Sequence, residues 1–584
     1  MGSPLRRSSD RARSVAPNLR TVEPTTKAHG FVRTFAGTHE SFGQTLQATG
    51  SADRLGYVLS LHQAYAANQV THAVVRSAQG EAQTVGSDVD GQTALGKVRY
   101  AFGRSRDGYA EVMVRDQSVV RDLSAALTSV AGNGELAPSV GSRLQGHNAG
   151  YAFDLQIPLG SHADGSAKTT ALYRHLTSYA TQSVQGPASG ISSSYFNDRD
   201  RIEDNTLELA RAFGKTSLAL KYGLRTEGLD TLDPSLAGNT KEQSHYVRPL
   251  LAASGTGNGE AAAALATTVH GLTQTQRSIA LRLVYDPSEQ LHYTVAAYDS
   301  TFSIFGRSFD PRLGIVWTPS ARTAIRASAG TTFQSPQLTA LYVPSTLPAP
   351  DANGRISIGN AHLQADHATE YDLGFEELLA GKRHPARLSA DFYRTNLRTP
   401  SQRLLPAATC PPGEPNLACA SYPINIGNAV YSGAEFRLER PFDGGTTLRV
   451  GYGINSAYPV NAPAEVQNGA IVAHEQFLGV PLHKLTFEID HRPPAGFSYD
   501  AAFLYEGRYN ELNRPPFATM RASIGYAIGE LEFNASGTNL TNVYATRFTQ
   551  AGAGTRYGGT NGPVATDAYA LPGRVITFSL ARRF

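Results

Sequence analysis

The chain has 584 residues, of which 41% are hydrophobic and 17% are charged, and its formal net charge is +3. This near-neutral balance gives no basic footprint for nucleic acid, and no apolar run of roughly 18 or more residues is present, which excludes a transmembrane helix. Glycine (56), tyrosine (27) and phenylalanine (24) are plentiful, which favours many strands over many helices.

The N-terminal segment, residues 1–27, is rich in arginine and serine and lacks the apolar core of a secretory signal peptide. We expect it to be disordered and to be followed by one domain, residues 28–584. Either the start of the chain is truncated, or export depends on a signal that the chain does not contain.

From about residue 29 onward, segments of about nine to twelve residues alternate apolar with small or polar side chains. In the segment 217–225, Leu218, Leu220 and Tyr222 share one face, because strand side chains alternate with a period of two. In the last strand, Phe578 and Leu580 share the face opposite Ser579. Strands of about 9–11 residues match the tilted length that crosses a bilayer, whereas strands of soluble proteins have a mode of about 5–6 residues.

The connections between these segments fall into two classes. Short ones occur at 286–289, 318–322, 492–496 and 527–530, and long ones near 119–149, 181–200, 334–369, 398–432 and 542–572. Alternation of short turns with long loops is typical of outer-membrane barrels. The sequence therefore predicts an all-β fold, a transmembrane antiparallel barrel of about 22 strands with long extracellular loops and short periplasmic turns; the stretch 244–270 leaves the count open by one.

Few residues are candidates for catalysis, metal binding or ligand binding. Cys410 and Cys419 are the only cysteines, and their spacing in a proline-rich segment fits either a loop disulfide or two reduced thiols. The acidic and basic residues of 196–204 fit either a solvated loop or a contact with a ligand at a barrel mouth. His62 and His175 fall on polar strand faces, where we expect them to line the lumen. Because no catalytic or metal-ligand constellation occurs, we expect no enzyme activity, no cofactor and no metal site.

Five motifs in chain order resemble those of TonB-dependent receptors, and the likeness runs from about residue 28 to Phe584. They lie in 330–342 (GTTFQSPQLTALY), 359–376 (GNAHLQADHATEYDLGFE), 425–436 (NIGNAVYSGAEF), 480–484 (VPLHK) and 535–548 (ASGTNLTNVYATRF). The residues that carry the likeness are Phe333, Pro336, Leu341, Tyr342, Asn360, Tyr371, Gly374, Gly433, Glu435, Asn539, Leu540, Asn542 and Tyr544. The terminal strand, with Phe578, Leu580 and the final Phe584, resembles the signal that the barrel-assembly machinery reads.

The resemblance implies an outer-membrane receptor for TonB-dependent uptake of a bulky, scarce nutrient, most often a ferric siderophore. It implies a monomer in contact with outer-membrane lipid in a Gram-negative cell, with a small-molecule metal chelate as ligand and no nucleic acid partner. Relatives carry a plug inside the barrel, which is not recognisable here, so coupling to the TonB complex would require a plug with a TonB box. A passive porin-like channel, a plug-less barrel scaffold and a soluble all-β binding or adhesion module remain as alternatives.

Overall fold

The structure is a computed structural model that describes most of the chain from residue 22 to Phe584. The ranges outside the description are 1–21, 68–73, 77–81, 85–87, 104–105, 123–126, 130–135, 139–142, 162–166, 186–193, 232–272, 342–355, 358–359, 361, 380–383, 405–419, 462–472, 478, 494, 511–513, 544–546, 549–563, 566–570 and 572. The ambiguous stretch 244–270, Cys410 and Cys419 therefore lie outside the described residues.

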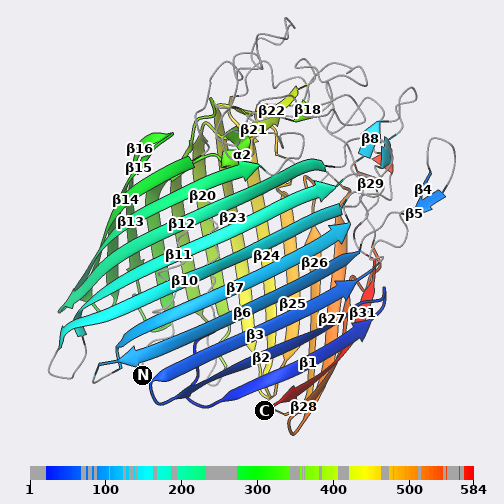
Figure 1. Cartoon of the computed structure of the whole chain (residues 1–584), viewed down its shortest axis with the longest axis horizontal. Coiled ribbons are helices and arrows are strands. Elements are labelled where there is room, and N and C mark those ends of the chain that lie inside the picture. The colour runs from blue at the N-terminus through cyan, green and yellow to red at the C-terminus, as the bar shows by residue number, and fades with distance from the viewer. Residues whose placement is uncertain are drawn as a thin grey trace, which may run out of the picture.

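One 22-stranded antiparallel sheet closes on itself as a barrel (Figure 1). Each strand pairs with the next one along the chain, and the last strand pairs with the first. The barrel strands are β1 (His29–Gly37), β2 (Phe42–Ala52), β3 (Leu55–Ala66), β6 (Val89–Phe102), β7 (Gly108–Asp122), β10 (Arg143–Ser161), β11 (Ala167–Gln185), β12 (Ser194–Phe213), β13 (Thr216–Thr231), β14 (Thr273–Ser288), β15 (Leu291–Phe302), β16 (Gly306–Trp317), β17 (Thr323–Gln334), β19 (Asp366–Leu378), β20 (Arg387–Arg398), β23 (Asn428–Pro441), β24 (Thr446–Pro459), β25 (His483–His491), β26 (Gly496–Glu506), β27 (Phe517–Ile528), β28 (Leu531–Thr538) and β31 (Val575–Arg583). The predicted fold class is confirmed.

The two ends of the barrel differ in their connections. At one end, here called the turn end, the strands are joined by 53–54, 103–107, 162–166, 214–215, 289–290, 318–322, 379–386, 442–445, 492–495 and 529–530. At the other, the loop end, the longer connections include 67–88, 123–142, 232–272, 335–365, 399–427, 460–482 and 539–574. The loop connections hold the remaining elements: α2 (Leu338–Leu341), β4 (Val74–Arg76), β5 (Ala82–Thr84), β8 (Leu127–Ser129), β9 (Leu136–Pro138), β18 (Ile356–Ser357), β21 (Ser401–Leu404), β22 (Ala420–Asn425), β29 (Arg547–Phe548) and β30 (Val564–Ala565). None of the described helices is both long and apolar enough to cross a bilayer.

An apolar band covers the outside of the barrel. Directly opposed residues on paired antiparallel strands share one face, so Tyr57 of β3, Val98 of β6 and Val112 of β7 form one outward row. All three are exposed, as are many large apolar residues at the same face of other strands. The intervening positions face the lumen and are mostly small or polar. This arrangement, apolar outside and polar inside, is the one a barrel needs in lipid.

The seam of the barrel joins the two ends of the described chain. The N–H of Gly30 in β1 donates to the carbonyl of Phe584 at 2.8 Å, and the N–H of Phe584 donates to the carbonyl of Gly30 at 3.0 Å. A Cβ at Gly30 would lie 2.7 Å from Cζ of the Phe584 ring. The terminal aromatic therefore packs across a glycine at the point where the cylinder closes.

We expect deletion of Phe584 to reduce assembled barrel severalfold without reducing synthesis, because the deletion removes the terminal ring and the two hydrogen bonds that Gly30 and Phe584 share at the end of the seam. The measurement is the fraction of protein whose migration on a gel changes on boiling, compared with total protein by immunoblot. Phe584→Tyr, which keeps the ring and the backbone, serves as the control. Equal assembled fractions for the deletion and the full chain would contradict this role.

The strands of one wall are longer than the sequence predicts. β11 has 19 residues and β12 has 20, so they occupy much of the segment 181–200 that was expected to be a loop. Asp200, Glu203 and Asp204, expected in a solvated loop, lie within β12. Beyond the apolar band both faces of a strand can be polar, and the alternation that marks strands in the sequence disappears there.

The predicted lumen position of His175 is also wrong. His175 of β11 is opposed by Phe153 of β10, and Phe153 is opposed by Val112 on the outer face. His175 therefore faces outward, where its Nδ1 lies 2.9 Å from Oδ1 of Asn205. Its neighbours Leu172 and Leu176 face the lumen instead, which inverts the local pattern. His62 of β3 lies on the lumen face, where its Nδ1 is 2.9 Å from Oγ1 of Thr45.

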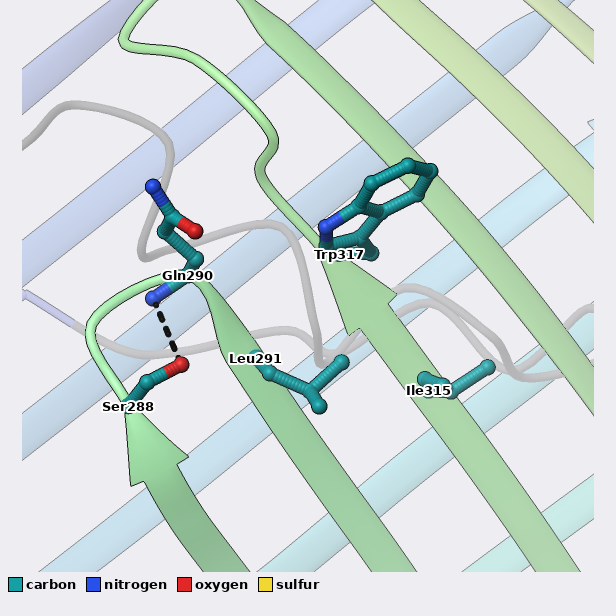
Figure 2. Close-up of a pocket in the computed structure, with 5 residues that line it drawn as sticks. All are labelled: Ser288, Gln290, Leu291, Ile315 and Trp317. Atoms are coloured by element: carbon teal, nitrogen blue, oxygen red, sulfur yellow. Dashed lines mark hydrogen bonds between the residues drawn. The ribbon is translucent and has the colours of Figure 1, made fainter.

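Aromatic residues mark the turn end of the apolar band. A shallow hollow of about 370 Å³ lies between β14, β15 and β16. Figure 2 shows the residues that line it, which are Ser288, Gln290, Leu291, Ile315 and Trp317. Trp317 ends β16 opposite Leu291, and half of its surface is exposed. The hollow opens on the outer surface, away from the lumen, and an indole at this level is typical of an interfacial girdle.

Trp317 is the only tryptophan in the chain, so it reports on membrane insertion. In vesicles we expect its fluorescence to be quenched more by lipids brominated near the headgroup than by lipids brominated near the chain terminus. Aqueous iodide should quench it weakly, because the ring lies in the membrane interface. Strong iodide quenching without any effect of brominated lipid would instead indicate a soluble β-protein.

Candidate functional site

The inner wall of the barrel carries alternating positive and negative side chains. Arg174 of β11 pairs with Asp154 of β10 at 3.1 Å, and Lys484 of β25 pairs with Glu506 of β26 at 3.9 Å. Arg449 of β24 contacts Asp490 and Glu488 of β25. Such a polar wall suits a water-filled path or the polar surface of whatever occupies the lumen.

A cluster of four charged residues lies on this wall near the turn end. The guanidinium of Arg99 contacts Glu111 at 2.6 Å and Glu23 at 2.5 Å, and the ammonium of Lys97 lies 3.3 Å from Glu111 and 3.7 Å from Glu23. The Lys97 side chain is only 1% exposed. The ring of Tyr109 lies 4.4 Å from the Arg99 guanidinium. The two cations are therefore balanced by two carboxylates, of which Glu111 is largely buried and Glu23 is 60% exposed.

Glu23 belongs to the segment 22–28, which runs along the inner wall before β1 begins. Thr25 accepts a hydrogen bond from Ser51 of β2 through its carbonyl at 2.9 Å. Its N–H donates to Oγ1 of Thr49 at 3.3 Å. A Cβ at Gly56 would lie 2.5 Å from Cβ of Pro24, so the glycine leaves room for the segment. The segment ahead of the first strand is thus fixed inside the lumen.

Two glycines of the family-like motifs lie under side chains that bridge neighbouring strands. Gly374 of β19 is opposed by Arg326 on one side and Asp391 on the other. A Cβ at Gly374 would lie 2.7 Å from Oδ1 of Asp391, so glycine allows Arg326 to reach Asp391 across β19. Arg387 of β20 extends this network by contacting Glu376 at 3.2 Å.

Gly433 of β23 likewise leaves space for a side chain that crosses its strand, here the side chain of Tyr393. It is opposed by Tyr393 and Asn455, and a Cβ there would lie 2.6 Å from the Tyr393 hydroxyl. The hydroxyl donates to Oδ1 of Asn455 across β23. Glu435, two residues along on the same face, pairs with Arg437 at 2.6 Å. Both glycines therefore stabilise the wall, and neither is shown to contact a ligand.

The loop-end rim above β17, β19 and β20 contains a small hydrophobic core. Leu338 and Leu341 of α2 pack with Leu363, and all three are buried. Asn360 lies beside them: its Nδ2 donates to the carbonyl of Pro423 at 3.0 Å, and its N–H donates to the carbonyl of Ala340 at 2.8 Å. Asn360 therefore joins the 335–365 and 399–427 connections.

Asn425 joins the same two connections through its side-chain amide. Its Oδ1 accepts from the N–H of Gln364 at 2.9 Å, and its Nδ2 donates to the carbonyls of Gln364 at 3.1 Å and Thr399 at 2.6 Å. Thr399 has a left-handed φ of 56°, rare for a β-branched residue. Its N–H donates to the carbonyl of Gly427 at 2.6 Å. The Asn425 amide thus hydrogen-bonds to backbone groups as a neighbouring strand would, and it fixes the positions of Gln364 and Thr399 relative to each other.

We expect Asn425→Ala to loosen the rim without unfolding the barrel. The change removes three hydrogen bonds and costs about 1–3 kcal/mol locally, because the backbone groups of Gln364 and Thr399 lose their partner. Hydrogen exchange of the Gln364 amide should therefore become at least about tenfold faster. Asn396→Ala, which removes a surface contact with Arg394, is the matched control. Unchanged exchange at Gln364 would contradict this function of Asn425.

The remaining motif residues that the structure describes have positions in turns, in the apolar band or beside α2. Asn539 and Asn542 follow β28 with left-handed φ values of 47° and 54°, a conformation that asparagine tolerates. The N–H of Val543 donates to Oδ1 of Asn539 at 3.1 Å, and the N–H of Leu540 donates to the carbonyl of Met520 at 2.7 Å. Tyr371 faces outward in the apolar band, and Pro336 precedes α2. The ring of Phe333 stacks on the ring of Phe302, and the two ring centres are 4.6 Å apart. Tyr342 and Tyr544 lie outside the described residues.

Among the described residues there is no group of three His, Cys, Asp or Glu side chains that could hold a metal ion. Sequence reasoning did not single out Lys97, Arg99, Glu111 or Glu23 as a group. Their only local signal is the alternation of charge on one face of β6 and β7. Their meeting with Glu23 depends on the path of the chain before β1, which no local pattern indicates.

Comparisons with known proteins agree with this architecture. Residues 37–540 match the family model described as TonB dependent receptor-like, beta-barrel. A variant of the ferric enterobactin receptor PfeA from Pseudomonas aeruginosa is 15% identical, with a TM-score of 0.68 over 97% of this chain and 81% of that chain. The siderophore receptor PirA from Acinetobacter baumannii is 12% identical, with a TM-score of 0.67 over 97% and 81%.

The FrpB iron transporter from Neisseria meningitidis is 12% identical, with a TM-score of 0.65 over 96% of this chain and 82% of that chain. At such low identities the likeness concerns the fold alone. No curated protein gives a significant match to the sequence.

Proposed function

Because the chain belongs to the family of TonB-dependent receptor β-barrels, we propose that it forms the barrel of a receptor that takes up ferric siderophores. The closed 22-stranded barrel of this family is a Gram-negative outer-membrane protein. Three of the similar structures are described as siderophore or ferric enterobactin receptors or as an iron transporter, which supports iron chelates as the cargo.

The observation that carries the proposal is the combination of a polar lumen with a fixed loop-end rim. Asn360 and Asn425 hold one arc of the rim in place, and a preformed rim reduces the ordering that ligand binding would otherwise require. A rigid scaffold that carries loops is the usual arrangement for a binding surface. Energy from the TonB complex would reach this barrel through a plug that bears a TonB box.

The test is uptake of iron-labelled siderophores by cells that make this protein, in strains with and without TonB. We expect TonB-dependent accumulation of at least one ferric siderophore, and binding of the same complex by the purified chain in detergent. Equal accumulation with and without TonB would favour the passive-channel alternative. A barrel that binds no ferric chelate and supports no uptake would exclude the receptor function.

The remaining partners follow from the same proposal. We propose that the protein acts as a monomer and that the barrel-assembly machinery recognises the strand that ends in Phe584. Its activity is then transport rather than enzymatic catalysis. Size measurement in detergent, with the bound detergent subtracted, tests the monomer.

A further inference from the structure

Two oxygen atoms of the lumen wall near the loop end are buried and have no hydrogen-bond partner among the described residues. They are Oδ1 of Asp200 in β12 and Oε1 of Gln274 in β14. Gln274 is only 6% exposed, so water reaches its side chain poorly. Because burying an unpaired polar atom is costly, an oxygen of this kind indicates a bound water or ion.

The register places these two residues on either side of Glu227 in β13, and the three strands are neighbours in one wall (Figure 1). Glu227 directly opposes Gln274, and Asp200 is its diagonal neighbour on β12. Opposed and diagonal neighbours on one face of a sheet lie within reach of long side chains. All three face the lumen, because Tyr222 on the other face of β13 is exposed outside the barrel. We call Asp200, Glu227 and Gln274 the three-strand oxygen site.

The hydrogen bonds around the site leave its oxygens turned toward one another. Nε2 of Gln274 donates to Oγ of Ser335 at 3.5 Å, so the carbonyl oxygen is the free end of this amide. One oxygen of Glu227 accepts from the guanidinium of Arg225 at 3.2 Å. Ser335 belongs to the 335–365 connection, and the Gln274 amide therefore also links the site to the loop-end rim.

The formal charge around the site is negative. Arg225 contacts Glu227 and directly opposes Asp204, so one guanidinium lies among the carboxylates of Asp200, Asp204 and Glu227. The next cation along this row of the wall is Arg115 of β7, and its guanidinium contacts Ser178 of β11 at 3.2 Å. The carboxylates therefore outnumber the cation that contacts them.

We propose that the three-strand oxygen site binds a divalent cation, Ca²⁺. Its donors are carboxylate and amide oxygens, which Ca²⁺ prefers, and Ca²⁺ accepts irregular geometry with water in its other positions. The ion gives the free oxygens of Asp200 and Gln274 a partner and offsets the excess negative charge. With two carboxylates and one amide, the set differs from the groups of three acidic, His or Cys ligands that are absent from the described residues.

A cation at this position joins three strands at the loop end of the wall. β13 ends at Thr231 and β14 begins at Thr273, so the site lies where the connection 232–272 leaves the wall and returns to it. The inference goes beyond nutrient uptake and does not depend on the cargo, because the ligands belong to the wall and to no transported molecule.

The experiment measures binding of radiolabelled Ca²⁺ by equilibrium dialysis to the purified full chain in detergent, after a wash with EDTA. In Glu227→Gln and in Gln274→Met we expect the binding of one Ca²⁺ to weaken at least about tenfold, because each change removes an oxygen ligand. Gln274→Met does so without changing the charge. Mg²⁺ at the same concentration should displace little Ca²⁺, because Mg²⁺ demands near-ideal octahedral geometry.

The matched control is Glu435→Gln, the same substitution at a lumen-facing carboxylate that already has Arg437 as its partner at 2.6 Å. A gel shift on boiling shows for each variant that the barrel is assembled. The inference is wrong if the unmodified chain binds no Ca²⁺ or if both site variants bind it as tightly as the unmodified chain. An equal loss in Glu435→Gln would overturn it too, because the effect would then reflect general lumen charge.

Hydrogen exchange locates the ion independently of affinity. Ca²⁺ should slow exchange of the Glu227 and Gln274 amides in the unmodified chain, because the ion reduces opening of the strand ends that hold its ligands. It should have no such effect in Gln274→Met. Bound Ca²⁺ that leaves these amides unchanged would place the ion elsewhere and overturn the inference. Loss of siderophore uptake would not affect this result, so the two proposals fail separately.

Discussion

Replacing Glu111 by glutamine is expected to destabilise the barrel by about 3–5 kcal/mol, because the change leaves two largely buried cations with too little counter-charge. Glu111 is the nearer partner of Lys97, at 3.3 Å, and contacts Arg99 at 2.6 Å. The only other carboxylate in contact with either cation is Glu23, among the described residues, and its side chain is 60% exposed. Removing one partner of a buried ionic network costs more than the network itself contributes.

The measurement is the denaturant midpoint of the refolded protein in lipid, followed by Trp317 fluorescence. Glu435→Gln is the control, since its partner Arg437 is exposed and such pairs contribute at most about 1 kcal/mol. Adding Lys97→Met to Glu111→Gln should recover part of the loss, because it removes the more deeply buried unpaired charge. Equal midpoints for Glu111→Gln and Glu435→Gln would show that water in the lumen screens the cluster.

Replacing Phe578 by lysine is expected to cost about 2–4 kcal/mol if the residue lies near the membrane midplane, and less near an interface. Phe578 is 63% exposed on the outer face of β31, where it is opposed by Ala535 and Ala36. A lysine there would place an ammonium in hydrocarbon between two alanines that offer it no counter-charge. The free energy of unfolding in lipid vesicles gives the cost directly.

Ser579→Ala is the matched control for this substitution. Ser579 is the next residue of the same strand and faces the lumen, so its replacement by alanine should change stability by less than about 0.5 kcal/mol. Phe578→Leu, which keeps an apolar side chain, should also be mild. If the lysine and alanine variants were equally stable, Phe578 would not face lipid.

Much of the architecture could be predicted from the sequence because it depends on local rules. The face of Leu220 and Tyr222, the short turn at 318–322 and the approximate number of strands follow from a period of two and from the length needed to cross a bilayer. The prediction failed where the bilayer no longer imposes a pattern. Strands β11 and β12 extend into 181–200, where the sequence predicts a loop. His175 has a different cause: it lies in the outward row of Phe153 and Val112, and the apolar Leu172 and Leu176, which face the lumen, invert the local pattern.

The residues of the candidate site depend on register and closure, which no local segment determines. Arg326 meets Asp391 only because Gly374 lies between them on a third strand, and Arg99 meets Glu111 only in the observed register of β6 and β7. A shift of one residue in either register would move each side chain to the opposite face of the wall. The sequence by itself therefore determined that a lipid-facing barrel forms. The tertiary structure decided which charges meet inside it, because those contacts join strands whose pairing is set by the closed sheet as a whole.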